Sequence, residues 1–163
     1  MRIAAFLKRK RLSLRRKRIF RQIRKGKREI RSLPPYERGL YYEDFVCRWM
    51  KTQGYKILDR NVPGPQKSEI DIVAKIGKAL IFTEVKARRK ETLFSPLHSI
   101  DERKRHLLAL ATEHYLNCLQ ETGISLEELE IRYDVACVGF DREGIPRSIE
   151  YYRGYLEPNY ERF

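Results

Sequence analysis

Several common signatures are missing from this sequence. Its three cysteines stand far apart with no Cys-x-x-Cys spacing, so neither a disulfide framework nor a cysteine-rich zinc site is indicated. No apolar run approaches the roughly 20 residues that a transmembrane helix needs, so no stable membrane insertion is expected. Sparse cysteines that form no pairing pattern are typical of a reducing compartment, which predicts a cytoplasmic location.

Acidic residues are almost absent from residues 1–32. This segment holds 15 of the 35 Lys and Arg residues and one of the 22 acidic residues, Glu29. The rest of the chain has 20 basic and 21 acidic residues, so the net charge of +13 belongs to the N-terminal segment. A basic block of this density is typical of proteins that bind a polyanion, either nucleic acid or an anionic membrane surface.

The basic segment also carries a narrow apolar stripe. Leu12, Ile19, Ile23 and Ile30 recur at helical spacing, and "SLPPYERG" then breaks the pattern. We therefore expect a disordered or conditionally helical arm over 1–35, helical when an anion relieves its charge repulsion, and one domain over 36–163. The candidate polyanion-binding residues of the arm are Arg9, Lys10, Arg11, Arg15, Arg16, Lys17 and Arg18.

The remaining chain alternates between helical and strand patterns. The expected elements are a helix over 37–53, strands over 55–61, 69–76, 79–86, 131–140 and 146–152, and a long helix from a capping box at Ser99 to about Glu121. Gly77 and Lys78 suit a two-residue hairpin turn. The long helix between two strands implies a right-handed parallel crossover, so the fold class is α/β with a mixed sheet.

The predicted hairpin places ionisable side chains opposite one another. Pairing across Gly77-Lys78 puts Asp71 opposite Glu84 and Glu69 opposite Lys86, all on one face. The Cβ atoms of directly opposed residues lie about 5 Å apart, and two carboxylates on them repel each other. Either one carboxyl takes up a proton because its pKa is raised, or a divalent cation binds between them.

The charged face of this hairpin is apolar nearer the turn. The alternation puts Val73, Leu80 and Phe82 beside the charged residues, and Ile70 and Ile72 on the opposite face. A face that changes from apolar to charged is typical of the bottom of a cleft. The alternative is a solvated hairpin face with weak surface ion pairs, which would be polar along its whole length.

The arrangement "SEID…EVK" on a hairpin after an initial helix resembles the PD-(D/E)XK nuclease superfamily, with its restriction-endonuclease-like and Holliday-junction-resolvase-like branches. More closely, the chain resembles the YraN-like family of uncharacterised bacterial proteins. The similar segments are "GLYYEDFVCRWMKTQGYKILDRN", "SEIDIVAK", "LIFTEVKAR" and "RYDVACV". The resemblance implies a restriction-endonuclease-like core, a mixed central sheet flanked by helices in the order α-β-β-β-α-β-β.

The resemblance also implies roles for single residues. Asp71 and Glu84 match metal-binding acids, and Glu43 matches a helix glutamate that completes the metal site. Lys86 matches a lysine that orients the attacking water, and Lys104 matches one that contacts the scissile strand. The implied cofactor is Mg²⁺ or Mn²⁺. Glu69 and Arg132 match motif positions with less defined roles. Arg88 and Arg89 add to the candidate nucleic-acid-binding residues. Ser68 replaces the usual glycine, so we expect a local adjustment of the loop.

These observations support three functions to different degrees. The first is a Mg²⁺-dependent endodeoxyribonuclease acting on DNA, with branched or damaged DNA as options. The second is a non-catalytic nucleic-acid-binding protein on the same fold. The third is a peripheral membrane protein held by the arm, which the few apolar residues per charge disfavour. Resolvase-like relatives suggest a homodimer.

Overall fold

A five-stranded mixed sheet forms the centre of the protein. The computed structural model describes residues 2–90 and 101–156, with side chains described from residue 12 onward. The strands are β1 (Lys56–Pro63), β2 (Glu69–Ile76), β3 (Ala79–Arg89), β4 (Glu130–Phe140) and β5 (Pro146–Tyr152), in this spatial order. Neighbours pair antiparallel except β3 and β4, which are parallel because α3 (Glu102–Gln120) carries the chain back between them. The predicted α/β class, mixed sheet and element order are confirmed.

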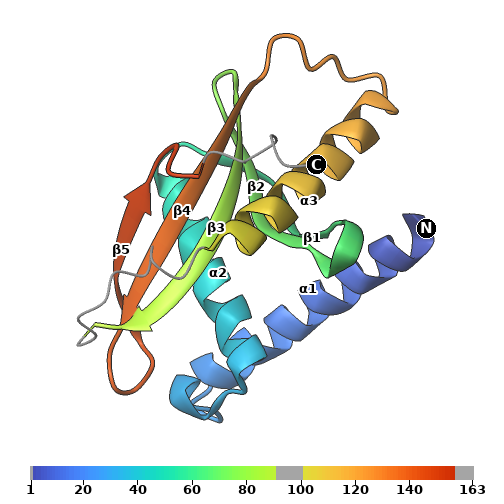
Figure 1. Ribbon diagram of the computed structural model, residues 1–163. Helices are drawn as coiled ribbons and strands as arrows, with labels where there is room; N and C mark the ends of the chain where they lie inside the picture. The colour runs from blue at the N-terminus through green and yellow to red at the C-terminus, as the bar shows by residue number, and fades with distance from the viewer. Residues whose placement is uncertain (1, 91–100, 157–163) are drawn as a thin grey trace.

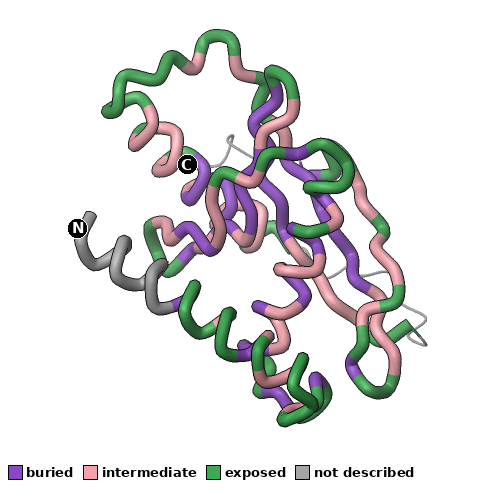
Figure 2. Tube along the Cα trace, turned by 180° about the vertical axis from the view of Figure 1, so that it is seen from behind, coloured by how far each residue is buried: buried purple, intermediate pink, exposed green. Residues whose placement is uncertain are grey.

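Helices α2 (Pro35–Thr52) and α3 cover opposite faces of this sheet (Figure 1). Under α2, Val46 and Met50 pack with Ile72 and Ile81. Under α3, a second cluster of buried apolar residues contains Val73, Leu80, Phe82, Leu108 and Ala111. The sheet is therefore buried on both sides, as Figure 2 shows along its central strands.

Both helix starts differ from the sequence prediction. Helix α2 begins at Pro35, two residues early, because proline suits a first helical position, where no N–H is needed. Helix α3 begins at Glu102, and its N-cap is Asp101, whose Oδ1 accepts the Lys104 backbone N–H at 2.7 Å. The predicted capping residue, Ser99, lies outside the described residues.

The basic segment is a helix, α1 (Arg2–Arg24), followed by the short 3-10 turn Ile30–Ser32. Three of the four residues of its predicted stripe, Leu12, Ile19 and Ile30, are buried against Leu33 and Leu40, and Ile23 is partly buried beside them. Helix α1 thus lies against α2 and β1. The dependence of this helix on an anion and the arm–domain boundary at residue 35 stay predictions.

Within residues 2–90 and 101–156, no helix combines the length and the apolar character that crossing a membrane requires.

Candidate active site

The β2–β3 hairpin has the predicted register. Its pairs run from Ile76 with Ala79 to Ile72 with Thr83, and Gly77 adopts the positive φ (56°) that the turn requires. The ladder pairs end at Ile72 and Thr83, one position before Asp71 and Glu84, and the direct opposition of these two stays a prediction. Oδ2 of Asp71 accepts the backbone N–H of Val85 at 2.8 Å. A carboxylate therefore takes the place of a ladder partner.

The predicted alternation of β2 also fails at Asp71. Ile72 packs under α2, but Ile70, which was expected on the same face, packs with Val73 under α3. The pairs Arg60–Ile72 and Val62–Ile70 flank this position, so the β1–β2 register brings Asn61, whose φ is 47°, opposite Asp71. A left-handed residue interrupts a regular strand, and asparagine tolerates this conformation better than most residues. The irregularity at Asn61 accompanies the change of face at Asp71.

Glu84 is almost completely buried, with 3% of its side chain exposed, and it contacts two ammonium groups. Lys86 Nζ lies 2.9 Å from Oε1, and Lys104 Nζ lies 2.8 Å from Oε2. Lys104 reaches Glu84 from α3. This helix packs closely on the β1–β2 loop, because a Cβ on Gly64 would lie 2.7 Å from the Ala111 backbone. The structure therefore brings together three of the predicted catalytic residues.

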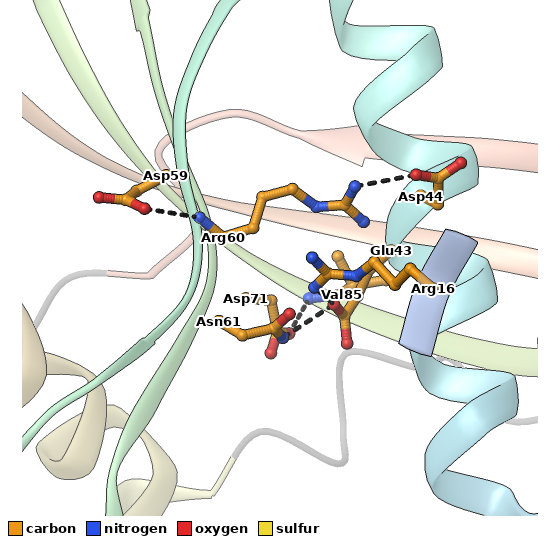
Figure 3. Close-up of polar contacts among 8 residues, drawn as sticks. All are labelled: Arg16, Glu43, Asp44, Asp59, Arg60, Asn61, Asp71 and Val85. Atoms are coloured by element: carbon orange, nitrogen blue, oxygen red, sulfur yellow. Dashed lines mark hydrogen bonds and ion pairs between the residues drawn. The ribbon is translucent and has the colours of Figure 1, made fainter. Parts of the chain in front are cut away.

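Glu43 approaches the same region from α2. Its Oε2 accepts a hydrogen bond from Asn61 Nδ2 at 2.8 Å and one from Arg16 Nη2 of α1 at 3.2 Å (Figure 3). Asn61 thus lies between Glu43, to which it is bonded, and Asp71, which it faces across the β1–β2 pairing. Through Asn61, the helix glutamate is connected to the strand aspartate.

Burial and like charges raise the pKa of two of these carboxyl groups. Burial is the largest cause for Asp71, whose pKa lies well above its usual range, and the charges of Glu84 and Glu43 add to it. Burial also raises the pKa of Glu43, although the Asn61 hydrogen bond and the charge of Arg16 oppose it. These electrostatic effects show that the three acids act on one another.

Lys104 remains protonated in this environment. Burial alone would lower the pKa of its ammonium group, but the charges of Glu84 and Asp71 outweigh burial and raise it. A charged ammonium group is therefore held beside the acids from the α3 side.

The acids suit a hard cation in kind. Mg²⁺ and Mn²⁺ prefer oxygen ligands, and carboxylates supply them. Asn61 Oδ1 adds a buried oxygen without a hydrogen-bond partner in the described part of the chain. Within residues 12–90 and 101–156, however, no three or more His, Cys, Asp or Glu side chains converge as a metal-binding group. The oxygen atoms of these side chains suit Mg²⁺ or Mn²⁺ in chemical type. Basic side chains or amide groups contact the carboxylate oxygens.

Asn61, Arg60 and Asp44 were not predicted as site residues. Arg60 Nη1 lies 2.8 Å from Asp44 Oδ1 beside the Glu43 contacts. One signal was available for Asn61, because asparagine is unusual inside a strand. The pairing of Arg16 with Glu43 leaves no local signal, because 27 residues separate them.

The predicted nucleic-acid-binding residues occupy different environments. Lys17, Arg18 and Arg89 are exposed, and Arg88 is half-buried. Arg15 bonds Glu37 on α2 at 2.9 Å, and Arg16 is nearly buried against Glu43. The side chains of Arg9, Lys10 and Arg11 lie outside the described residues.

The remaining motif positions have structural surroundings. Arg132 forms a two-pronged ion pair with Asp134, and Glu69 lies half-buried at the start of β2. Ser68 is extended, with φ −67°, and the positive φ values fall on Gln66 and Lys67 within the short 3-10 turn Pro65–Lys67. The loop thus places its strained residues before Ser68.

Comparison with known proteins gives one consistent family. The sequence model of "Uncharacterised protein family UPF0102" matches residues 42–138. A UPF0102 protein of Moorella thermoacetica is 35% identical over 117 residues, covering 72% of this chain and 92% of the relative. UPF0102 proteins of Syntrophotalea carbinolica and Desulfosudis oleivorans are 34% and 37% identical, covering 73% and 74% of this chain and 90% of each relative. The chain belongs to the UPF0102, or YraN-like, family.

Proposed function

We propose that this protein is a metal-dependent nuclease that hydrolyses phosphodiester bonds of DNA. One observation carries the proposal: where the β2–β3 ladder ends, Asp71 and Glu84 lie in mutual electrostatic contact with Lys86 and Lys104 beside them. Phosphodiester hydrolysis needs positive charge on the phosphoryl oxygens and a positioned water, and this set of side chains can serve both needs.

Each side chain has a distinct part in this proposal. Asp71, Glu84 and Glu43 would hold Mg²⁺ or Mn²⁺, which supplies Lewis acidity and lowers the pKa of a bound water. Lys86 and Lys104, both contacting Glu84, place positive charge where a phosphate would approach. The like charges that raise the pKa of Asp71 supply electrostatic affinity for a cation.

Helix α1 would supply affinity that does not depend on sequence. Its exposed surface carries Lys17, Arg18, Arg21 and Arg24, and phosphate contacts of such residues release counterions. Its apolar stripe is buried against Leu33 and Leu40, which removes it from a membrane surface. This burial favours nucleic acid over lipid as the polyanion.

A non-catalytic nucleic-acid-binding protein is the second candidate. It is favoured by the pairing of Glu84 with two lysines and of Glu43 with Arg16, because these contacts neutralise the acids without a metal. Binding and cleavage measured on the same substrates separate the two functions.

The test is cleavage of single-stranded, duplex, flap and four-way DNA, and of a single-stranded RNA, with Mg²⁺, Mn²⁺ or EDTA. The nuclease proposal expects metal-dependent cleavage of at least one substrate, lost in Asp71→Asn. Binding of these substrates without any cleavage would establish the second candidate instead.

The role of α1 is tested by the salt dependence of binding. The triple variant Lys17→Gln, Arg18→Gln, Arg21→Gln should lower the slope of log affinity against log salt by up to about 3, because each lost phosphate contact removes about 0.9. A matched control replaces three exposed lysines elsewhere, Lys51, Lys56 and Lys78, by glutamine. Equal slopes for the two variants would contradict phosphate binding by α1.

A further inference from the structure

Asn61 has three features that its role as a strand residue does not explain. Its side chain is buried, its φ of 47° is unfavourable for most side chains, and its Oδ1 has no hydrogen-bond partner within the described residues. A buried polar atom without a partner costs about 1–3 kcal/mol. Such a cost, together with backbone strain, is typical of a position that serves a site.

The contacts of Asn61 fix the orientation of its amide. Nδ2 donates to Glu43 Oε2 at 2.8 Å, so the carbonyl oxygen Oδ1 is the atom left over. The β1–β2 register places Asn61 opposite Asp71 (Figure 3). An oxygen of the kind that Mg²⁺ and Mn²⁺ prefer therefore belongs to a side chain that contacts Glu43 and comes from the β1 position opposite Asp71.

We propose that Asn61 is a further cation-binding residue: its Nδ2 holds Glu43 in position, and its Oδ1 is a ligand of the divalent cation. This inference rests on the proposed metal site and extends it to β1. The proposed role also accounts for the left-handed backbone of Asn61, because that conformation accompanies the placement of the amide beside Asp71.

The test is a calorimetric titration of the full-length protein with Mn²⁺ in the absence of nucleic acid. Asn61→Gly keeps a residue that adopts φ 47° and removes the amide, so the fold should persist while Mn²⁺ affinity falls at least about tenfold. Asn61→Asp keeps a side-chain oxygen and tolerance of this backbone conformation but loses the Nδ2 donor to Glu43, so it should bind Mn²⁺ more tightly than Asn61→Gly. Asn117→Gly, on the exposed face of α3, is a control for loss of an amide.

Each outcome decides the inference. Wild-type affinity in Asn61→Gly, an Asn61→Asp variant as weak as Asn61→Gly, or no Mn²⁺ binding by any protein would overturn it. Because no nucleic acid is present, Mn²⁺ binding through Asn61 by a protein that cuts no substrate would contradict the nuclease proposal alone.

Arg16 supports a second inference from a different contact. Its side chain is only 11% exposed, and its guanidinium contacts Glu43 through one nitrogen at 3.2 Å. Its Nε is buried with no hydrogen-bond partner among the described residues. Burial and the nearby charge of Arg60 lower the pKa of Arg16. The charge of Glu43 acts in the opposite direction and raises this pKa, but the other two effects are larger. Arg16 lies outside the family match of residues 42–138.

We infer that Arg16 is a displaceable counter-charge: it neutralises Glu43 when no cation is bound, and Mn²⁺ must displace it. In the same titration, Arg16→Met should bind Mn²⁺ at least about fivefold more tightly than the wild type. Arg15→Met is the matched control. It removes the same charge from the neighbouring residue, which contacts Glu37 and not Glu43. Equal affinities for the two variants, or weaker binding by Arg16→Met, would contradict the displacement.

Discussion

Two groups of carboxylates lie at this sheet, and their surroundings differ. Asp134 on β4 is fully buried, and hydrogen bonds from neighbouring groups satisfy its carboxylate. Arg132 reaches it with two nitrogens, both at 2.8 Å, and the Tyr151 hydroxyl and the Gly154 backbone N–H each donate at 2.8 Å. This group anchors the chain after β5 to the centre of the sheet.

Two acids of the candidate site, Asp71 and Glu43, have fewer or poorer partners. Asp71 accepts a backbone N–H, and the neighbouring charges that act on it most strongly are the carboxylates of Glu84 and Glu43. Glu43 is paired with Arg16 through one contact at 3.2 Å, compared with the two at 2.8 Å between Arg132 and Asp134. Asn61 beside it keeps an oxygen without a partner.

The difference in hydrogen-bond partners distinguishes a carboxylate that stabilises the fold from carboxylates that are available for a function. A saturated carboxylate stabilises the fold, because its partners replace the water that it lost. Carboxylates left in mutual repulsion cost stability and remain available for a cation. The predictions below change one group at a time.

The largest effect on stability is expected from Asp134→Ala. It leaves the Arg132 guanidinium, the Tyr151 hydroxyl and the Gly154 N–H without their acceptor, and should lower the free energy of unfolding by about 3 kcal/mol. Urea denaturation measures this change. The exposed pair of Glu29 and Arg31 provides the control, since Glu29→Ala should cost less than about 1 kcal/mol. A similar small cost for Asp134→Ala would mean that the two groups do not differ as described.

A large effect on activity without loss of the fold is expected from Lys86→Ala. Glu84 keeps Lys104 as a partner, so the buried carboxylate is not left without a counter-charge. The cleavage rate should fall about 10²–10³-fold, as for loss of one group that stabilises transition-state charge. Lys78→Ala, at the exposed turn of the same hairpin, should leave the rate unchanged. An unchanged rate in Lys86→Ala would remove Lys86 from the site.

A smaller effect of opposite sign is expected from Asp71→Asn. The raised pKa of Asp71 means that its charged form is disfavoured in the fold, so the carboxylate costs stability as pH rises above its unfolded pKa of about 3.9. Asparagine can still accept the Val85 N–H without the charge. The variant should therefore be more stable than the wild type at pH 7 in EDTA, and this advantage should shrink toward pH 4.

Urea denaturation at pH 4, 5.5 and 7 checks the Asp71→Asn prediction. Asp134→Asn should show the opposite sign at pH 7, because it breaks a saturated ion pair. Destabilisation of both variants at pH 7 would contradict the distinction between the two groups.

Local patterns explain which parts of the site could be predicted from the sequence. The β2–β3 register depends on a glycine at the turn and on alternation near it, and both are readable in a few residues. Lys104 belongs to a helix whose face is set by its own periodicity. The family resemblance supplied the roles of the acids.

The contacts that could not be predicted depend on distant parts of the chain. The failure of alternation at Asp71 accompanies the backbone of Asn61 on another strand, and the partner of Glu43 comes from α1, 27 residues earlier. The stripe of Leu12 and Ile19 predicted a helix, but not the surface that buries it. Periodicity determines which face is apolar, whereas tertiary packing determines what covers that face.

The most direct test of the account is the initial rate of metal-dependent DNA cleavage by the wild type and Asp71→Asn, purified in parallel and assayed with Mg²⁺ and with EDTA. The account predicts cleavage by the wild type with Mg²⁺, none with EDTA, and at least a 10³-fold lower rate for the variant, on the order of the loss expected for a group that acts on transition-state charge. Equal rates for the two proteins, or no cleavage by the wild type of any substrate in the panel, would contradict it.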